Sequence, residues 1–247
     1  MTRSTLSEQT VVVIGGGSGI GRAVAAAARA DGAAVIVAGR EGERLAAAAA
    51  GLGARAEHVD VTERASLDAL FGRIGDFDHL VLTVGPQFAS PKGSSNSSPV
   101  FAELDVAAAR AAFDVKFWGQ LEAAQAALGH LRPGGSITLT SGLLSRRFSA
   151  GSLVKSTMNA AAEALAKSLA RELAPLRVNV VSPGVTDTEA WHHLAGPARD
   201  ALFERIGGGL PVGRVGRAEE IAAAYLLAMR NGFMTGAVLD VEGGGLL

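Results

Sequence analysis

A glycine-rich turn near the N-terminus, Gly15-Gly16-Gly17-Ser18-Gly19-Ile20-Gly21, constrains the fold more than any other feature of the chain. It lies between the apolar run Val11–Ile14 and a helical stretch. In a strand-to-helix turn of this kind, Gly15 allows a tight reversal, Gly19 lets the backbone approach a pyrophosphate, and Gly21 lets the helix pack against the sheet. The helix N-terminus then faces the phosphates. We therefore predict a dinucleotide site here; the alternative is a turn with a purely structural role.

Short apolar runs alternate with alanine-rich helical stretches along the rest of the chain. Such runs are typical of strands that are buried on both faces of a parallel sheet. We expect strands at Thr10–Ile14, Ala34–Ala38, Ala56–Val59, His79–Val84, Ser136–Thr140, Val178–Ser182 and Ala237–Val241. We expect helices at Gly19–Asp31, Glu41–Leu52, Glu63–Arg73, Asp105–Leu131, Gly151–Leu173 and Ala218–Met229. The alternation predicts a three-layer, doubly wound α/β Rossmann fold with a seven-stranded, mostly parallel sheet.

Two segments do not follow this alternation. Residues Pro86–Val100 are rich in serine, glycine, proline and asparagine, which is typical of a long loop. Val185–Gly213 carries Trp191, His192 and His193 between ends that contain glycine and proline, and loops of this length in compact domains often act as lids. We interpret residues 1–247 as a single Rossmann-type domain, in which residues 185–213 form a lid over the substrate.

The composition excludes several classes of partner and site. The net charge is −1, so no excess of positive charge favours nucleic acid or an anionic membrane. The chain has no cysteine, and hence no disulfide, no thiolate metal site and no cysteine nucleophile. No signal peptide is apparent in Met1–Thr10, and no run of about 20 apolar residues predicts a membrane span. We therefore expect a cytoplasmic protein with no nucleic-acid partner, no membrane partner and no metal site.

The end of the second expected strand, Val37-Ala38-Gly39-Arg40, indicates which dinucleotide is bound. An acidic residue at this place binds the ribose diol of NAD, and the chain has none. Gly39 leaves space, and Arg40 supplies a fork of donors that suits a 2′-phosphate. The pattern favours NADP(H); the alternative is a solvated surface arginine.

Further motifs accompany the glycine turn. They are Arg177-Val178-Asn179-Val180-Val181-Ser182-Pro183-Gly184, Thr235-Gly236 and Glu242-Gly243-Gly244. On these motifs the chain resembles the short-chain dehydrogenase/reductase family over nearly its whole length. The family's loop Thr-Gly-x-x-x-Gly-x-Gly is matched at three glycines of the turn, with Ile14 in place of the threonine. The resemblance implies a nicotinamide-dependent oxidoreductase with a small-molecule substrate, whose helices pair between subunits in a homodimer or homotetramer.

The resemblance also implies which residues bind the cofactor. They are Gly15, Gly17, Ser18, Gly19, Ile20, Gly21, Arg40, Asp60, Val61, Gly85, Lys155, Pro183, Gly184 and Thr188. In the family, the acidic residue at the position of Asp60 meets the adenine. The Pro-Gly turn and the threonine at the positions of Pro183, Gly184 and Thr188 hold the nicotinamide.

The departures from the family pattern are concentrated where the chemistry takes place. The family's catalytic asparagine aligns with Lys116, and its paired serines align with Ser141-Gly142, so Ser141 is a candidate with Ser145 behind it. The tyrosine of its Tyr-x-x-x-Lys pair aligns with Gly151, four residues before Lys155. Reduction of a carbonyl needs a proton for the oxygen, and glycine has none to give.

Other groups are candidates for the proton donor. If Lys116 points toward Lys155, burial and the repulsion between like charges lower its pKa toward neutrality. The alternative is an ion-paired or solvated Lys116, with a water molecule in the space at Gly151 as the donor. The chain's one tyrosine, Tyr225, lies in the last expected helix and is a poor substitute. We assign catalysis to Ser141, Lys155 and Lys116.

Two functions are compatible with this pattern. The first is an NADP(H)-dependent oxidoreductase that acts on a small carbonyl or quinone-like substrate with a non-standard active site. The second is a catalytically impaired NADP(H)-binding protein that serves as a sensor or a partner subunit. Gly151 favours the second function, whereas a lid that carries Trp191, His192 and His193 favours the first.

Overall fold

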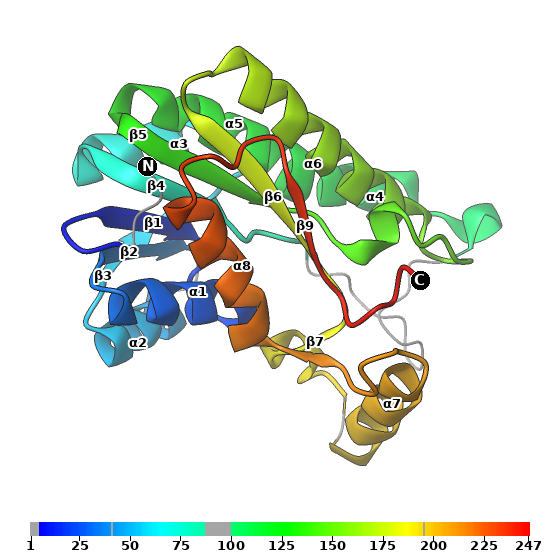
Figure 1. The fold of residues 1–247 in the computed structure, drawn as a ribbon. Helices are drawn as coiled ribbons and strands as arrows, with labels where there is room; N and C mark the ends of the chain where they lie inside the picture. Colours follow the sequence, from blue (N-terminus) through cyan, green and yellow to red (C-terminus); the bar gives the residue numbers. More distant parts are fainter. Residues whose placement is uncertain (1–4, 41, 87–99, 195) are drawn as a thin grey trace.

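A parallel sheet forms the centre of the protein. The structure, a computed structural model, describes residues 5–40, 42–86, 100–194 and 196–247 (Figure 1). Seven strands lie in the order β3-β2-β1-β4-β5-β6-β9, and all neighbours are parallel. They are β1 (Thr10–Ile14), β2 (Ala34–Gly39), β3 (Arg55–His58), β4 (Phe77–Leu82), β5 (Leu131–Thr140), β6 (Arg177–Pro183) and β9 (Val238–Val241). This confirms the predicted doubly wound α/β fold.

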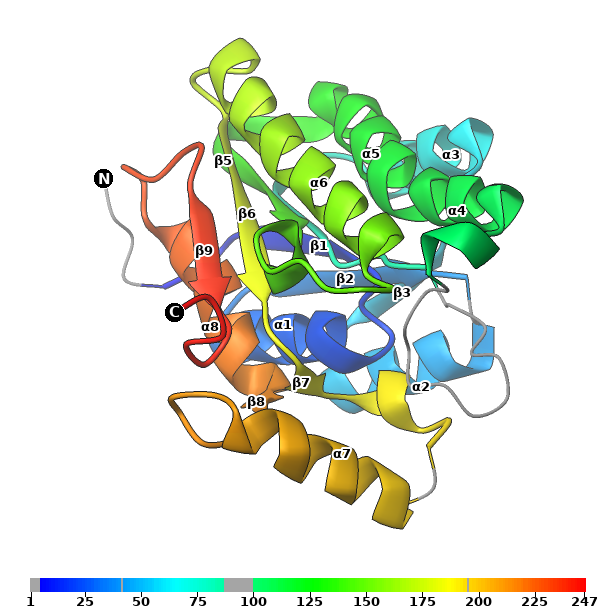
Figure 2. The same ribbon diagram turned by 90° about the vertical axis from the view of Figure 1, so that its right-hand side faces the viewer.

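Helices cover both faces of the sheet, as Figure 2 shows. One face carries α1 (Gly19–Ala30), α2 (Gly42–Leu52) and α8 (Ala218–Arg230); the other carries α3 (Arg64–Ile74), α4 (Val106–Phe113), α5 (Gly119–Ala127) and α6 (Leu153–Glu172). The side chains of β1 explain this arrangement, because all of Val11–Ile14 are fully buried while they alternate between the faces. A strand that is apolar on both faces needs a helix layer on each side.

The expected helix Asp105–Leu131 is wrong as a continuous helix. It consists of α4, a π-helical turn over Asp114–Trp118, α5 and a short 3-10 turn, and Leu131 already belongs to β5. In the π turn the Gly119 N–H donates to the Asp114 carbonyl, so one extra residue is accommodated. The helical stretch ends ahead of Pro133, which has no N–H to donate and cannot continue a helix.

Other expected boundaries differ by one to five residues. Helix α6 begins at Leu153 rather than at Gly151, and β5 begins five residues before Ser136. The expected helix start at Glu41, and most of the expected loop Pro86–Val100, lie outside the described residues.

The segment after β6 has more regular structure than a loop. It contains β7 (Thr186–Asp187), a 3-10 turn over Glu189–Trp191 and α7 (Gly196–Gly208), and β7 pairs with β8 (Gly216–Arg217). Helix α7 lies apart from the three layers, below them in Figure 2. The lid interpretation of residues 185–213 stays a prediction.

The strand order places a site at the carboxyl ends of β1 and β4. From β1 the chain moves outward to β2 and β3, and then returns to β4 on the other side of β1. Ligands of doubly wound sheets bind in the crevice where the order reverses in this way. Among the described helices, none is long and apolar enough to cross a membrane.

Candidate active site

The glycine turn packs so closely that side chains are excluded at several positions, Gly15 and Gly21 among them. Gly15 has a φ of +91°, and a Cβ there would lie 2.6 Å from Thr83 Oγ1. A Cβ on Gly21 would lie 2.2 Å from the Gly15 carbonyl oxygen, well inside van der Waals contact. Both glycines are therefore required for α1 to begin directly above the end of β1. Thr83 also donates its side-chain hydroxyl to the Ile14 carbonyl at 3.0 Å, so it ties β4 to the turn.

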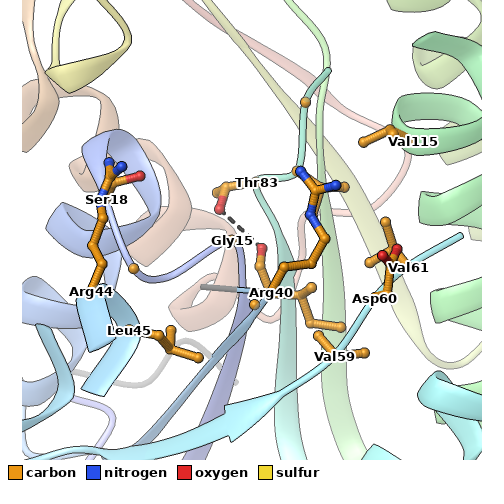
Figure 3. A pocket seen from close by; sticks show the side chains of 15 residues that line it. Gly15, Ser18, Arg40, Arg44, Leu45, Val59, Asp60, Val61, Thr83 and Val115 are labelled. Atoms are coloured by element: carbon orange, nitrogen blue, oxygen red, sulfur yellow. Dashed lines mark hydrogen bonds between the residues drawn. The ribbon is translucent and has the colours of Figure 1, made fainter. Parts of the chain in front are cut away.

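A cavity of about 790 Å³, counting its open mouth, extends from this turn along the ends of β2 and β3 (Figure 3). Its lining includes several predicted cofactor residues: Gly15, Gly17, Ser18, Arg40, Asp60, Val61 and Gly85. It also includes Arg44, Leu45, Thr83 and Val115, which the sequence reasoning did not single out. Arg44 could have been predicted from the sequence, because it follows Arg40 by four residues at the start of a helix.

The cavity is cationic at one end and acidic beside it. The guanidinium groups of Arg40 and Arg44 project into it, and Asp60 lies across from Arg40 (Figure 3). Burial alone would raise the pKa of Asp60, but hydrogen bonds from Thr62 and the charge of Arg40 outweigh burial and lower it. Asp60 is thus an ionised hydrogen-bond acceptor beside two donors that suit a phosphate.

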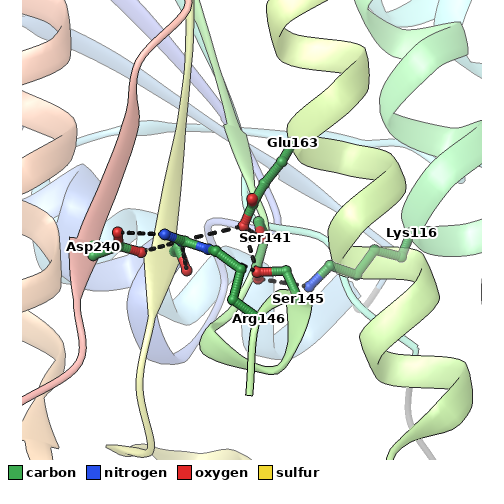
Figure 4. Close-up of polar contacts among 7 residues, drawn as sticks. Lys116, Ser141, Ser145, Arg146, Glu163 and Asp240 are labelled. Atoms are coloured by element: carbon green, nitrogen blue, oxygen red, sulfur yellow. Dashed lines mark hydrogen bonds and ion pairs between the residues drawn. The ribbon is translucent and has the colours of Figure 1, made fainter. Parts of the chain in front are cut away.

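The π turn brings Lys116 to the end of β5. Its ammonium donates to the Ser141 carbonyl at 2.9 Å (Figure 4). Burial, followed by the charge of Lys155, lowers the pKa of Lys116 to about 8. Burial also lowers the pKa of Lys155. The charge of Lys155 therefore acts on the pKa of Lys116 in the expected direction.

A buried glutamine anchors the backbone of the π turn. The Gln120 side-chain amide donates to the Lys116 carbonyl at 2.6 Å and accepts from the Thr140 N–H at 2.9 Å. The Lys116 carbonyl therefore connects to β5 through Gln120, and the ammonium connects to Ser141, the residue after β5. Tyr225 lies behind this connection, fully buried, with its hydroxyl 2.6 Å from Thr140 Oγ1. Burial raises the pKa of Tyr225, so this phenol is a weak acid as well as a distant one.

The hydroxyl of Ser141 points away from Lys116, toward a buried carboxylate. Ser141 and Ser145 donate to the same oxygen of Glu163 on α6, at 2.7 and 2.6 Å (Figure 4). Arg146 donates to Asp240 and lies 3.5 Å from Glu163, so its charge is already paired. The structure therefore brings Ser141, Ser145 and Lys116 together, while the Ser141 proton is engaged by Glu163. Nothing in the local sequence indicated Glu163.

The position four residues before Lys155 has a backbone that suits glycine. Gly151 has a φ of +73°, a left-handed conformation that residues with a side chain rarely adopt. Phe148, seven residues before Lys155, is 75% exposed. Neither position carries a group that could give up a proton.

The segment after β6 returns to the glycine turn. Gly184 donates to the Val241 carbonyl at 2.9 Å, and a Cβ there would lie 2.7 Å from Glu242 Cα. Thr188 comes within ordinary contact distance of a Cβ built on Gly19. The residues predicted for the two ends of the cofactor thus lie along one edge of the sheet. Among the described residues, no three histidine, aspartate or glutamate side chains gather in a way that could hold a metal ion.

Comparisons with known proteins agree with this geometry. A family model described as enoyl-(acyl carrier protein) reductase matches residues 15–245. The short-chain dehydrogenase/reductase ATR9 of Stachybotrys chlorohalonatus is 32% identical over 98% of this chain and 99% of its own length. An uncharacterized oxidoreductase of Methylorubrum extorquens is 36% identical over 98% of this chain and 99% of its own. The crystal structure of a small-chain dehydrogenase in complex with NADPH is 40% identical, with a TM-score of 0.80, and covers 97% of this chain and 99% of its own.

Proposed function

The chain belongs to the short-chain dehydrogenase/reductase family, and we propose that it is an NADP(H)-dependent oxidoreductase that reduces a small carbonyl or quinone-like compound. We further propose that its set of catalytic residues is atypical, because Gly151 stands at the position of the family's tyrosine and Lys116 at that of its asparagine. Under this proposal Lys116 supplies the proton and Lys155 holds the nicotinamide ribose.

The residues present suit an NADP-type dinucleotide. The close turn at Gly15 and Gly21 places the first N–H groups of α1 at the end of β1, where they suit a pyrophosphate. Arg40 and Arg44 offer two guanidinium forks for a 2′-phosphate, and the residue that directly follows β2 is Arg40 rather than a carboxylate. When bound, the reduced cofactor supplies a hydride to the substrate carbon.

The observation that carries the proposal is the partly buried Lys116 ammonium at the end of β5, which donates to the Ser141 carbonyl and is influenced by the charge of Lys155. With a pKa of about 8 it is protonated at neutral pH, and it is a stronger acid than an ordinary lysine. As the substrate carbon gains a hydride, its carbonyl oxygen gains negative charge and takes the Lys116 proton, which leaves a neutral amine and an alcohol. The amine then regains a proton from solvent. Lys155 remains charged and favours the developing oxyanion.

A specific feature favours the second function, a cofactor-binding sensor or partner subunit. The hydroxyl of Ser141, our candidate for a catalytic serine, donates to Glu163. Together with Gly151, this leaves the lysines as the remaining candidates for chemistry in our assignment. The two functions therefore differ in one property, namely whether bound NADPH is consumed.

Single-turnover oxidation of NADPH separates the two functions. Enzyme in excess over NADPH is mixed with quinones, diketones, ketones and enones, and the absorbance of reduced nicotinamide is followed. We expect its loss with at least one class and no loss in Lys155→Ala, whereas Lys167→Ala, which changes an exposed lysine of α6, behaves like wild type. Bound NADPH that no compound oxidises would favour the sensor.

A further inference from the structure

A carboxylate from the segment after β6 binds the glycine turn itself. Glu189 accepts the Gly19 N–H through Oε2 at 2.8 Å, and its other oxygen lies 2.9 Å from Arg22 Nη2. Gly19 is the first residue of α1, and Glu189 begins the 3-10 turn that follows Thr188. The two residues are 170 positions apart, so this contact joins the segment after β6 directly to the turn.

The Gly19 N–H belongs to the first turn of α1, whose N–H groups are the donors that suit a pyrophosphate. The first N–H groups of a helix have no partner within the helix, and together with the helix dipole they attract anions. A carboxylate satisfies such a donor as a phosphate oxygen does. One N–H has a single proton, so Glu189 and a phosphate oxygen cannot both accept a full hydrogen bond from Gly19.

Glu189 is ionised at neutral pH and is therefore a full competitor. Burial would raise its pKa, but backbone hydrogen bonds, including that from Gly19, and the charges of Arg22 and Arg44 lower it. The same charges attract phosphates. The groups around Glu189 thus form an anion-binding environment, and the Glu189 carboxylate occupies it.

We propose that Glu189 is an affinity-determining residue of the dinucleotide site, whose carboxylate competes with the cofactor pyrophosphate for the Gly19 N–H. A ligand that carries a pyrophosphate displaces Glu189 and releases the turn Glu189–Trp191 from α1. The inference rests on the proposed function, because it assumes that a dinucleotide binds here.

The aromatic side chain in the same turn reports the release. Trp191 donates its indole N–H to the Thr186 carbonyl at 3.0 Å and packs edge-on against Phe203 at 5.7 Å between ring centroids. Displacement of Glu189 changes the surroundings of Trp191. The chain has two tryptophans, so Trp118→Phe leaves Trp191 as the reporter.

Calorimetry with two ligands tests the competition. NADP⁺ carries the pyrophosphate, and adenosine 2′-monophosphate does not. We expect Glu189→Ala to tighten NADP⁺ by roughly tenfold, the scale of one charge-assisted hydrogen bond, and to leave 2′-AMP unchanged. Glu189→Gln keeps the size and removes the charge, so it gives a smaller gain. Glu204→Gln, an exposed glutamate of α7, controls for net charge and leaves both affinities unchanged.

Fluorescence provides an independent readout without turnover. In Trp118→Phe, ADP is expected to shift the Trp191 emission, and 2′-AMP is not. In Trp118→Phe/Glu189→Ala the emission is already shifted, and ADP adds nothing. Unchanged or weaker NADP⁺ binding in the folded Glu189→Ala and Glu189→Gln variants would overturn this inference alone. Failure of the wild type to bind NADP⁺ would overturn the proposed function with it.

Discussion

Two ends of the candidate site lie along one edge of the sheet and are built by different means. The nucleotide end is the glycine turn with the start of α1 and Arg40, and the reaction end is Lys116, Ser141, Ser145 and Glu163. The nucleotide end is formed mainly by backbone. The turn at Gly15 and Gly21 has no room for side chains, and the first N–H groups of α1 are the hydrogen-bond donors. At the reaction end, Glu163 accepts hydrogen bonds from the buried hydroxyls of Ser141 and Ser145, and the Lys116 ammonium donates to the Ser141 carbonyl. A site formed by closely packed backbone tolerates few substitutions, so its glycine pattern can be recognised in the sequence. A side-chain site can exchange its chemistry on the same scaffold.

The largest effect is expected from a substitution that disrupts the tight packing of the glycine turn. A methyl group at Gly21 would lie 2.2 Å from the Gly15 oxygen, so Gly21→Ala is expected to lower the free energy of unfolding by about 3 kcal/mol and to abolish NADPH binding. Gly72→Ala on α3 meets nothing within 4 Å and is expected to stabilise by about 0.5–1 kcal/mol. Urea unfolding and NADPH titration check both. Equal effects of the two variants would contradict the packing argument.

A change at the reaction end should leave the nucleotide end intact. Lys116→Met removes the proposed acid, and we expect the single-turnover rate to fall by about 10²–10⁴-fold, the usual contribution of a general acid. The Kd for NADPH should stay that of wild type, because Lys116 lies outside the cationic end of the cavity. A parallel loss of NADPH affinity would mean that the two ends are not separable.

Substitution of Arg40 tests selectivity within the nucleotide end. Arg40→Ala removes a fork from the proposed 2′-phosphate position, and NADPH affinity should fall by about 10- to 100-fold while NADH affinity stays the same. Arg44→Ala should also weaken NADPH binding, but by a smaller factor, because Arg44 lies on α2 rather than directly after β2. Binding titrations with both cofactors measure the ratio, and equal losses would refute the 2′-phosphate assignment.

The smallest effect concerns the anchor of the π turn. Gln120→Leu keeps the volume but removes the donor to Lys116 and the acceptor for Thr140, so we expect a loss of about 1–3 kcal/mol in unfolding free energy. NADPH affinity should not change. The pH midpoint of turnover should move, since the backbone of Lys116 is no longer held. An unmoved midpoint in a destabilised variant would leave Gln120 with a structural role alone.

The same contrast explains what could be predicted from the sequence. Strand β1 lies where its apolar run predicts, and the glycine turn forms as its spacing requires, because both depend on local pattern. Helix α7, which lies apart from the three layers, was not predicted. The π turn at Asp114–Trp118 was not predicted either, since it depends on contacts with the distant end of β5. The same holds for Glu163 and Glu189, whose partners lie 22 and 170 residues away in the sequence. Arg44 lies between these cases, because its spacing from Arg40 is visible in the chain.

The pH dependence of single-turnover NADPH oxidation tests most directly whether Lys116 replaces the usual acid. The pKa of Lys116 is lowered to about 8, so its ammonium is present below that pH and lost above it. With a productive substrate, the rate is expected to be flat from pH 6 to 7 and to fall through a midpoint near 8. In Lys116→Met the residual rate should show no such midpoint. A wild-type rate that stays constant through pH 9, or a midpoint that survives in Lys116→Met, would show that Lys116 is not the acid.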